Sequence, residues 1–497
     1  WLKHFWLSQE WLCGPKTWRL SMSGGRKLCS ASLDKIIEAS PSVSIPNYDR
    51  AAVTPGIVHI GVGNFHRAHQ CVFTDDALSI PGNESWGYVG MGLIPQDERA
   101  QAVLKEQDML YTLWEKGVSS EKLRVVGCHA DYILAPSDPE AAIRILSAAR
   151  TKIVTLTVTE KGYYVNLANG HLDMTSPIVK HDVSSLKSGA PASTVLKTAA
   201  GYLVAALRRR MADGTGGFTI LSCDNIQENG CKTRLAVLEL AEAVDPQIAV
   251  WIKKEVTFPN SMVDRITPAT TDEVKVELAS KYGIVDGWPI VCESFLLWVV
   301  EDKFKHGRPD WDKSPNGKCM FVDDVAPYEF MKLRLLNAVH QALSYPASLL
   351  GHGLVHDAMA DDRIASFLED YMAAAGRTVP PVKGLEKVEW CKTVIERFSN
   401  PAIRDTIFRL TEDATNRISV ALAPCLEADA VAPGEALTEG ELRAVVIPVA
   451  CWIRCLLGDT VGPLPATATL NRDDRGEGLR GVAQAAWQNG GVEAAAA

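Results

Sequence analysis

The sequence lacks any long apolar run, because no window approaches the roughly 18 continuous apolar residues of a membrane-spanning helix. It also lacks an excess of basic charge: 51 Lys and Arg stand against 60 Asp and Glu, for a net charge of −9. An acidic chain repels the phosphates of nucleic acids and anionic membranes. We therefore expect a cytoplasmic protein that binds neither nucleic acid nor a membrane. We expect a small-molecule partner, and composition does not separate a monomer from a weak homo-oligomer.

A zinc-binding motif is missing as well. The 12 cysteines include no C-x-x-C pair, and the closest two, Cys451 and Cys455, have no histidine nearby. Three histidines crowd the segment VHIGVGNFHRAH, but we expect His59 inside a strand and His66 and His69 at the start of a helix. We interpret them as structural or cofactor-lining residues and predict no metal site.

Residues 56–70, GIVHIGVGNFHRAHQ, combine a β-branched run, the pair Gly61-x-Gly63 and a polar helix start. This pattern predicts the strand, tight turn and helix N-terminus of a dinucleotide fold, where backbone N–H groups receive a pyrophosphate. His66 stands where the full fingerprint has its third glycine, so an ordinary strand-to-helix turn stays open. The cofactor residues predicted here are Ile60, Gly61, Val62, Gly63, Asn64, Phe65, His66 and Arg67.

Three further β-rich runs recur at the intervals of a parallel sheet with crossover helices. They are residues 86–93, 153–160 and 218–225. Ligands of such sheets bind beyond the carboxyl ends of the strands. Thr159, Glu160 and Asn225 end two of the runs, which places them at a cofactor or a substrate; capping of the next helix is the alternative.

The acidic residue that holds an NAD ribose follows the first glycine of the usual fingerprint by about 20 residues. Asp97 and Glu98 follow the second strand, but they lie further from Gly61 than that. The positive charge of Arg99, beside them, would instead suit the 2′-phosphate of NADP. The sequence therefore favours NAD and leaves NADP open.

The segment 328–343, YEFMKLRLLNAVHQAL, is a strongly helical and mostly apolar run that carries Lys332, Asn337 and His340. At about 100° per residue, these three point roughly 0°, 140° and 80° around an α-helix. Burying an ammonium, an amide and an imidazole side by side is costly unless each has a partner, so a functional cavity is one explanation. The other explanation is structural: the lysine snorkels to solvent, the asparagine lies near a helix end and the histidine is hydrogen-bonded in the core.

Several segments carry a resemblance to the polyol-specific long-chain dehydrogenases, from about Gly56 to about Gly458. They are IVHIGVGNFHRAHQ, LTVTEKGYY, SCDNIQENG, MVDRITP, VDDVAPYEFMKLRLLNAVH, VHDAMAD and IERFSNPAIRD. The resemblance implies NAD-dependent, metal-independent oxidation of D-mannitol to D-fructose, and the reverse reaction. Within the same chemistry, arabinitol, sorbitol, fructuronate and mannitol 1-phosphate stay open as substrates.

The resemblance also implies catalytic roles at matching positions. Lys332 resembles the family's general base, which takes the hydroxyl proton as hydride leaves for the nicotinamide. Asn225 and Asn337 resemble the amide pair that holds the developing alkoxide. Such a base needs a pKa near the working pH, and desolvation on an apolar helix face is expected to lower that of a lysine from about 10.4.

The remaining roles concern the substrate. His340 resembles the residue that hydrogen-bonds and orients the substrate, and Asp264, in MVDR, resembles the carboxylate that tunes the lysine and its proton path. Arg409 and Arg417 match distal residues that contact the sugar chain, although the intervening EDATN departs from the commoner DGS-type segment.

Two other functions compete with this one. Tyr328 and Lys332 form Y-x3-K, the spacing at which short-chain dehydrogenases pair a phenolate with a lysine, but the pair lies much further from Gly61 than in those compact enzymes. A nucleotide-binding protein without catalysis needs the glycine loop and has no use for Lys332, Asn337 and His340 together.

The length of 497 residues, 47% of them hydrophobic, suffices for two domains with cores. We predict an α/β fold, with a Rossmann-type N-terminal domain followed by a mostly α-helical C-terminal domain and an active site in the cleft. The predicted segments are an N-terminal extension 1–50, a dinucleotide-binding domain 51–287, a helical domain 288–485 and a tail 486–497. Residues 1–32, basic and poor in acid, suggest either an organellar presequence outside the fold or a misassigned start, with Met22 as the first residue.

Overall fold

The computed structural model describes residues 25–166, 169–427, 436–457, 478–482 and 484–485. The chain divides into two compact units. Unit 1 holds the described residues up to Glu115 together with Glu121–Val322, and unit 2 holds Lys116–Ser120 and the described residues from Asp323 onward. No helix in these described ranges is both long enough and apolar enough to cross a membrane.

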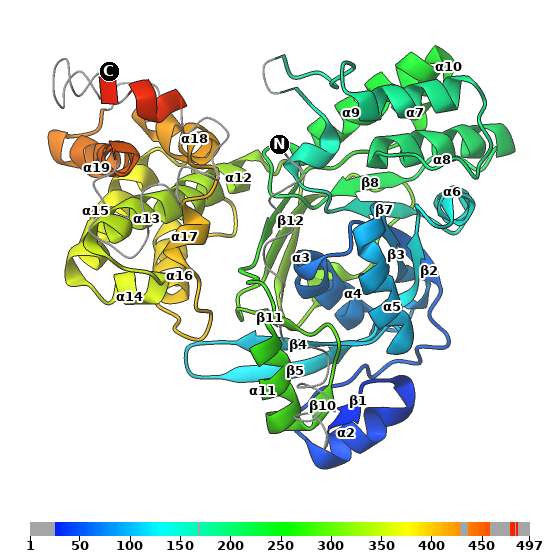
Figure 1. Cartoon of the computed structure of the whole chain (residues 1–497), viewed down its shortest axis with the longest axis horizontal. Helices are drawn as coiled ribbons and strands as arrows, with labels where there is room; N and C mark the ends of the chain where they lie inside the picture. Colours follow the sequence, from blue (N-terminus) through cyan, green and yellow to red (C-terminus); the bar gives the residue numbers. More distant parts are fainter. Residues whose placement is uncertain (1–24, 167–168, 428–435, 458–477, 483, 486–497) are drawn as a thin grey trace. The chain divides into compact units, whose positions relative to one another are not determined.

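Unit 1 is built on a five-stranded parallel sheet in the order β6-β3-β2-β7-β8 (Figure 1). Its strands are β2 Pro55–Ile60, β3 Gly87–Gly92, β6 His129–Leu134, β7 Ile153–Leu156 and β8 Thr219–Ser222. Counted along the chain within this sheet, the order is 3-2-1-4-5, which is that of a Rossmann fold. The order reverses at β2, so the switch point at which such sheets bind ligands lies at the carboxyl ends of β2 and β7.

The strand register sets these carboxyl ends level. Ile60 pairs with Met91 on one side and with Leu156 on the other, and Leu156 pairs with Ser222. The loops that leave β2, β3, β7 and β8 therefore emerge at one edge of the sheet.

Helices cover both faces of this sheet, so the side chains of β2 are buried on both sides. Ile57 packs into a core that includes α4, whereas Val58 and Ile60 pack into a core that includes α8 and α9. Figure 1 shows α9 near β8, against which it packs, and α8 packs against α9. The helices of unit 1 include α3 Asn64–Ala68, α4 Gln70–Leu78, α5 Glu98–Glu106, α6 Pro139–Ser147, α7 Pro177–Lys187, α8 Ala199–Asp213, α9 Asn229–Val244, α10 Pro246–Glu255 and α11 Asp272–Tyr282.

Unit 1 also contains two three-stranded sheets, and their strands extend it beyond the predicted boundary at residue 288. Their strands are β9 Ser261–Asp264, β12 Leu297–Glu301 and β13 Lys318–Val322 in one, and β11 Ile290–Cys292, β4 Tyr111–Lys116 and β5 Glu121–Val126 in the other. The sequence placed the boundary at residue 288, but residues up to Val322 pair with strands of unit 1. Local patterns did not reveal this because the partners β4 and β9 lie far away along the chain.

Part of the predicted N-terminal extension also belongs to unit 1. β1 Arg26–Lys27 pairs in parallel with β10 Ile284–Val285, and α2 Leu33–Ala39 follows. Leu28, which follows β1 directly in the sequence, is fully buried. The expectation that residues 25–32 lie outside the fold is therefore wrong, and the predictions for residues 1–24 and for the tail 486–497 lie outside the described residues.

Unit 2 is helical, so the predicted fold class, a Rossmann-type domain followed by a mostly helical one, is confirmed. α13 packs against α15, α17 and α19 and forms the centre of the unit. Its helices include α12 Ala326–Lys332, α13 Ala338–Leu350, α14 Val355–Met359, α15 Asp362–Arg377, α16 Lys387–Phe398, α17 Ile407–Leu410, α18 Ala414–Arg417 and α19 Glu439–Leu457. Two π-helical segments, Leu333–Asn337 and Ile418–Leu422, interrupt this series.

Candidate active site

The glycine loop of unit 1 is a tight turn that only glycine fits. Gly61 has φ +95°, and a Cβ there would lie 2.2 Å from the backbone oxygen of Thr157. The Thr157 hydroxyl donates a hydrogen bond to the Gly61 carbonyl at 2.7 Å, which holds the turn against the end of β7. Asn64 then begins α3 directly after Gly63. The predicted strand, turn and helix start are all present at the switch point of the sheet.

Two of the predicted cofactor residues point their side chains into the core instead. His66 and Arg67 are fully buried. The Arg67 guanidinium lies 3.4 Å from the Trp288 ring, donates to the Trp288 carbonyl and donates to the Asn64 side-chain oxygen at 3.1 Å. Burial lowers the pKa of Arg67 to about 10. These two side chains therefore serve the packing of unit 1.

Asp224 organises the carboxyl ends of β7 and β8, and the sequence reading missed it. Its carboxylate accepts hydrogen bonds from the backbone N–H groups of Val158 and Thr159, at 3.0 and 2.8 Å, and from the Tyr163 hydroxyl at 2.5 Å. Burial raises the pKa of Asp224. Thr159 takes a left-handed φ of +65° within this loop. The DN pair at the end of a β-rich run was the available signal, but only its asparagine, Asn225, was taken up.

The residues predicted at these strand ends occupy the expected edge. Thr159, Glu160 and Asn225 are all exposed, and they follow β7 and β8, whose ends are level. Asp97 lies at the end of β3, where its carboxylate accepts hydrogen bonds from the N–H groups of Leu93 and Ile94 at 2.9 and 3.2 Å.

Asp264 ends β9 and is buried, with 4% of its surface exposed. Its neighbour Arg265 anchors the segment. The Arg265 guanidinium donates to the Ala68 carbonyl at 2.7 Å and to the Glu115 carboxylate at 2.5 Å. The MVDR segment is thereby tied to the junction of α3 and α4, directly after the glycine loop.

In unit 2 the segment that joins Lys332 to Asn337 is π-helical, and this changes the predicted geometry. The backbone N–H of Ala338 donates to the carbonyl of Leu333, five residues earlier. Residues five apart are neighbours on a π-helix, so Lys332 and Asn337 share a face. The predicted separation of about 140° assumed a regular α-helix and is wrong for this segment. Lys332 is buried, with 6% of its surface exposed.

His340 lies one helical turn beyond Asn337 and is stacked on Phe398, with ring centroids 4.5 Å apart and an interplanar angle of 17°. Its Nε2 atom is buried and has no hydrogen-bond partner among the described residues. A buried polar atom of this kind is costly unless a partner arrives. Phe398 was not predicted, because a single aromatic residue on α16 gives no local signal of its partner.

Cationic groups surround this imidazole. Burial, and then the charges of Arg409, Arg397, Arg417 and Lys332, lower the pKa of His340 well below its usual value. The histidine is therefore neutral at physiological pH. The structure brings the predicted residues of unit 2 together and adds Arg397, which the sequence reading missed.

The two predicted arginines are held by different partners. Arg409 forms a two-pronged ion pair with Asp405, in which Nε donates at 2.6 Å. Arg417 donates to the carbonyl of Leu410 at 3.2 Å, at the end of α17. Arg417 directly precedes the second π-helical segment, which packs against the one that follows Lys332.

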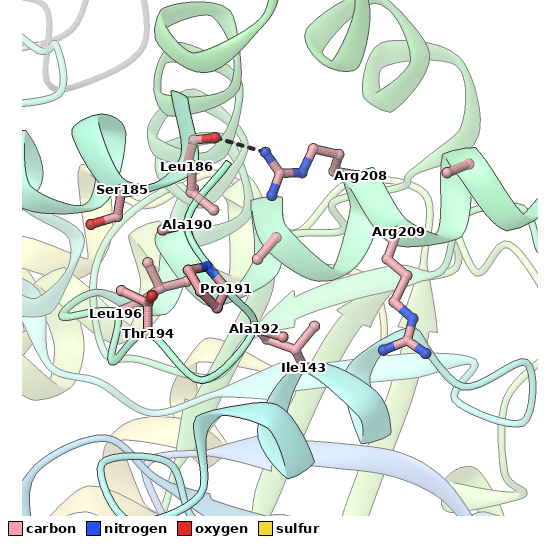
Figure 2. A pocket seen from close by; sticks show the side chains of 12 residues that line it. Ile143, Ser185, Leu186, Ala190, Pro191, Ala192, Thr194, Leu196, Arg208 and Arg209 are labelled. Carbon is pink, nitrogen blue, oxygen red and sulfur yellow. Dashed lines mark hydrogen bonds between the residues drawn. The ribbon is translucent and has the colours of Figure 1, made fainter. Parts of the chain in front are cut away.

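A cavity of about 400 Å³ in unit 1 uses none of the predicted residues (Figure 2). It lies among α6, α7, α8 and the loop that precedes α8, and Ile143 and Pro191 contribute apolar surface. Arg208 and Arg209 line it, and Arg208 donates to the Leu186 carbonyl at 2.8 Å. Because the cavity lies among helices and not at strand ends, it is distinct from the dinucleotide edge.

Comparisons with known proteins match most of unit 1 and most of unit 2. Residues 55–313 match the mannitol dehydrogenase Rossmann domain, and residues 324–462 match the mannitol dehydrogenase C-terminal domain. Mannitol 2-dehydrogenase of Pyricularia oryzae is 39% identical over 422 residues, covering 85% of this chain and 82% of that protein. The enzyme of the same name from Cereibacter sphaeroides is 42% identical over 420 residues, or 84% of each chain.

Two solved structures are similar in fold and sequence. Pseudomonas fluorescens mannitol 2-dehydrogenase, in a ternary complex with NAD and D-mannitol, has a TM-score of 0.79 and 36% identity, covering 92% of this chain and 89% of that chain. Substrate-free D-sorbitol dehydrogenase has a TM-score of 0.78 and 32% identity, covering 95% and 100%. With both domain models matched and relatives aligned over more than four fifths of its length, the chain belongs to the mannitol dehydrogenase family.

Proposed function

We propose that the chain catalyses the NAD-dependent oxidation of D-mannitol to D-fructose and the reverse reduction, with Lys332 as general base and no metal at the reacting alcohol. The observation that carries this proposal is the π-helical segment that sets Lys332 and Asn337 on one face, beside the unpartnered Nε2 of His340. The similarity to mannitol 2-dehydrogenases supports the choice of substrate.

Unit 1 fits a dinucleotide through its own residues. The Gly61 turn leads into the start of α3 at the switch point of a Rossmann sheet, where a pyrophosphate would bind. Asp97 puts a carboxylate at the end of β3, where it suits the ribose hydroxyls of NAD and repels the 2′-phosphate of NADP. When bound, the nicotinamide accepts the hydride of the carbinol carbon.

The protein's residues move the proton and hold the charge. We assign to the Lys332 amine the removal of the hydroxyl proton as the carbinol C–H bond breaks. The side-chain N–H groups of Asn337 and Asn225 donate to the developing alkoxide. The neutral His340 hydrogen-bonds a neighbouring hydroxyl through its buried Nε2, and we assign to Asp264 the tuning of the lysine and its proton path.

Arg409 and Arg417 complete the substrate side of the proposal. Their N–H groups donate to hydroxyls further along the sugar chain, and the Asp405 ion pair keeps Arg409 in one orientation. D-sorbitol is the second candidate substrate, because a D-sorbitol dehydrogenase is nearly as similar in fold as the mannitol enzyme. A cytoplasmic location is part of this proposal and is tested by cell fractionation.

The test is nicotinamide-linked turnover with EDTA added to the assay. D-mannitol, D-sorbitol, arabinitol, mannitol 1-phosphate, D-fructose and fructuronate are each measured with NAD(H) and with NADP(H). Fast exchange between D-mannitol and D-fructose with NAD(H), unchanged by EDTA, is the expected result. Preference for D-sorbitol, a uronate or a phosphate would contradict the substrate, and immediate loss of turnover on adding EDTA would contradict the metal-free mechanism.

A further inference from the structure

Three side chains with metal-binding atoms meet inside unit 1, away from the exposed strand-end residues. His66 of α3 and Cys71 of α4 are fully buried, and His129 of β6 is 2% exposed. Their ligand atoms all lie within 4.8 Å of one another. His66 Nε2 is 3.1 Å from Cys71 Sγ and 3.4 Å from His129 Nε2. Nitrogen and sulfur atoms at about these separations share one tetrahedral zinc ion when the metal–ligand bonds are about 2.0 to 2.3 Å.

A chain of hydrogen bonds fixes which nitrogen of His66 carries its proton. His69 Nε2 lies 2.9 Å from the Leu297 carbonyl, which can only accept, so His69 Nε2 is the donor and its Nδ1 is an acceptor. Gln70 Nε2 donates to that Nδ1 at 3.0 Å. The Gln70 side-chain oxygen, 3.3 Å from His66 Nδ1, therefore accepts from it.

The consequence is that the neutral His66 has its proton on Nδ1 and a bare lone pair on Nε2, the atom that faces Cys71 and His129. Metal-binding histidines have this arrangement, with the second ring nitrogen donating to an oxygen that orients the ring. His59 also keeps the His66 ring in place, since the two rings stack 3.3 Å apart at an angle of 7°.

Cys128 borders these three residues and is the candidate for a fourth ligand. Its Sγ is 4.0 Å from His129 Nδ1, the same distance as the Sγ of Cys71. The residue is fully buried. Two thiolates would neutralise a divalent cation, and the soft sulfur atoms favour zinc over magnesium or calcium.

We propose that His66, Cys71, His129 and Cys128 bind one structural zinc ion that ties α3 and α4 to β6 behind the glycine loop. On binding, each thiol loses its proton to solvent and forms a sulfur–zinc bond, while the two imidazoles bind as neutral ligands. With four protein ligands the ion has no open position, so it does not activate the alcohol. The absence of any C-x-x-C hid this site from the sequence, because its ligands come from a helix pair and a distant strand.

The test is the metal content of the full-length protein, produced with zinc in the growth medium and dialysed against metal-free buffer. Mass spectrometry of the metals should give about one zinc per chain. Cys71→Ala and His129→Gln should each lower this to less than about a tenth. Cys319→Ala is the matched control, because Cys319 is also free, buried and in unit 1, and it should retain the metal.

A second measurement covers the case in which a variant fails to fold. Wild-type protein produced with cobalt in place of zinc should show a thiolate-to-cobalt charge-transfer absorption, and Cys71→Ser should lack it. Wild-type protein that is folded yet holds no zinc, and that gives no cobalt absorption, would overturn the proposal and leave Cys71 as a thiol donating to His66 Nε2. Equal zinc in wild type and both ligand variants would overturn it too.

Discussion

Lys332 and Asn337 lie five residues apart across a π-helical segment, and the segment places both side chains on one face. An α-helix would turn them about 140° apart. Such segments are rare and frequently occur at functional sites. The catalytic proposal depends on this feature.

The contribution of Asn337 and Asn225, the amides proposed to hold the alkoxide, can be measured as a change in kcat. Asn337→Ala and Asn225→Ala should each lower kcat by about 10²- to 10³-fold, because each removes one donor to charge that develops only in the transition state. KM for D-mannitol should change much less. Asn47→Ala, at an exposed position of unit 1, is the control and should retain wild-type kcat. A fall confined to KM would show that the amides bind the ground state only.

The glycine loop predicts a difference between two glycines that both have positive φ. Gly61→Ala would place a Cβ 2.2 Å from the Thr157 oxygen, whereas Gly307→Ala, at φ +77°, has nothing within 4 Å. Gly307→Ala should cost only the backbone strain, about 1 to 2 kcal/mol, with NADH binding unchanged. Gly61→Ala should cost more and weaken NADH binding at least about tenfold. Measured by denaturation and NADH fluorescence titration, equal behaviour of the two variants would contradict the proposed role of the loop.

The proposed preference for NAD over NADP depends on Asp97, whose carboxylate lies at the end of β3. Asp97→Ser should lower the preference for NAD over NADP, expressed as a ratio of kcat/KM values, by about tenfold or more, because the 2′-phosphate no longer meets a negative charge. Glu98→Ser, a neighbour with the same charge change, should have little effect. If both variants keep the wild-type ratio, a group other than Asp97 distinguishes the 2′-hydroxyl of NAD from the 2′-phosphate of NADP.

The buried His340 predicts a pH dependence of stability. Burial and the charges of Arg409, Arg397, Arg417 and Lys332 lower its pKa in the folded state, so below about pH 6.5 the unfolded chain binds a proton that the folded chain does not. The free energy of unfolding should therefore fall with decreasing pH, by up to about 1.4 kcal/mol per pH unit from this residue.

The matched comparison for this prediction is His340→Asn, which cannot titrate in that range. The difference in free energy of unfolding between wild type and variant should shift against the wild type as the pH falls from about 7 to 5.5. Denaturant titrations at each pH measure it. A difference that stays constant would mean that His340 titrates alike in both states.

The sequence predicted the fold where the signals were local and regular. The β-branched run before Gly61-x-Gly63 and the β-rich runs near residues 153 and 218 became neighbouring parallel strands. The boundary at residue 288 failed because β11, β12 and β13 take their places through pairing with distant strands, which no local pattern encodes.

At the candidate site, residue identity was easier to predict than geometry. Lys332, Asn337 and His340 stood out by their spacing in an apolar run, and their roles, implied by the family resemblance, stay predictions. Their angular relation was wrong, because a π-helical segment has no signature in a window of apolar residues. Asp224 escaped notice because its role, holding the loop after β7, appears only when β7 and β8 are side by side. His66 was assigned to the cofactor because the glycine fingerprint gives no sign of which side chains turn inward.

The most direct test of the central claim is the turnover of Lys332→Ala with D-mannitol and NAD, beside Lys392→Ala, in which an exposed lysine of unit 2 is removed. NADH fluorescence titration confirms that each variant still binds the cofactor. We expect kcat of Lys332→Ala to fall by about 10²- to 10⁴-fold with unchanged NADH affinity, while Lys392→Ala behaves as wild type. Turnover of Lys332→Ala close to that of the wild type would contradict the assignment of Lys332 as the base.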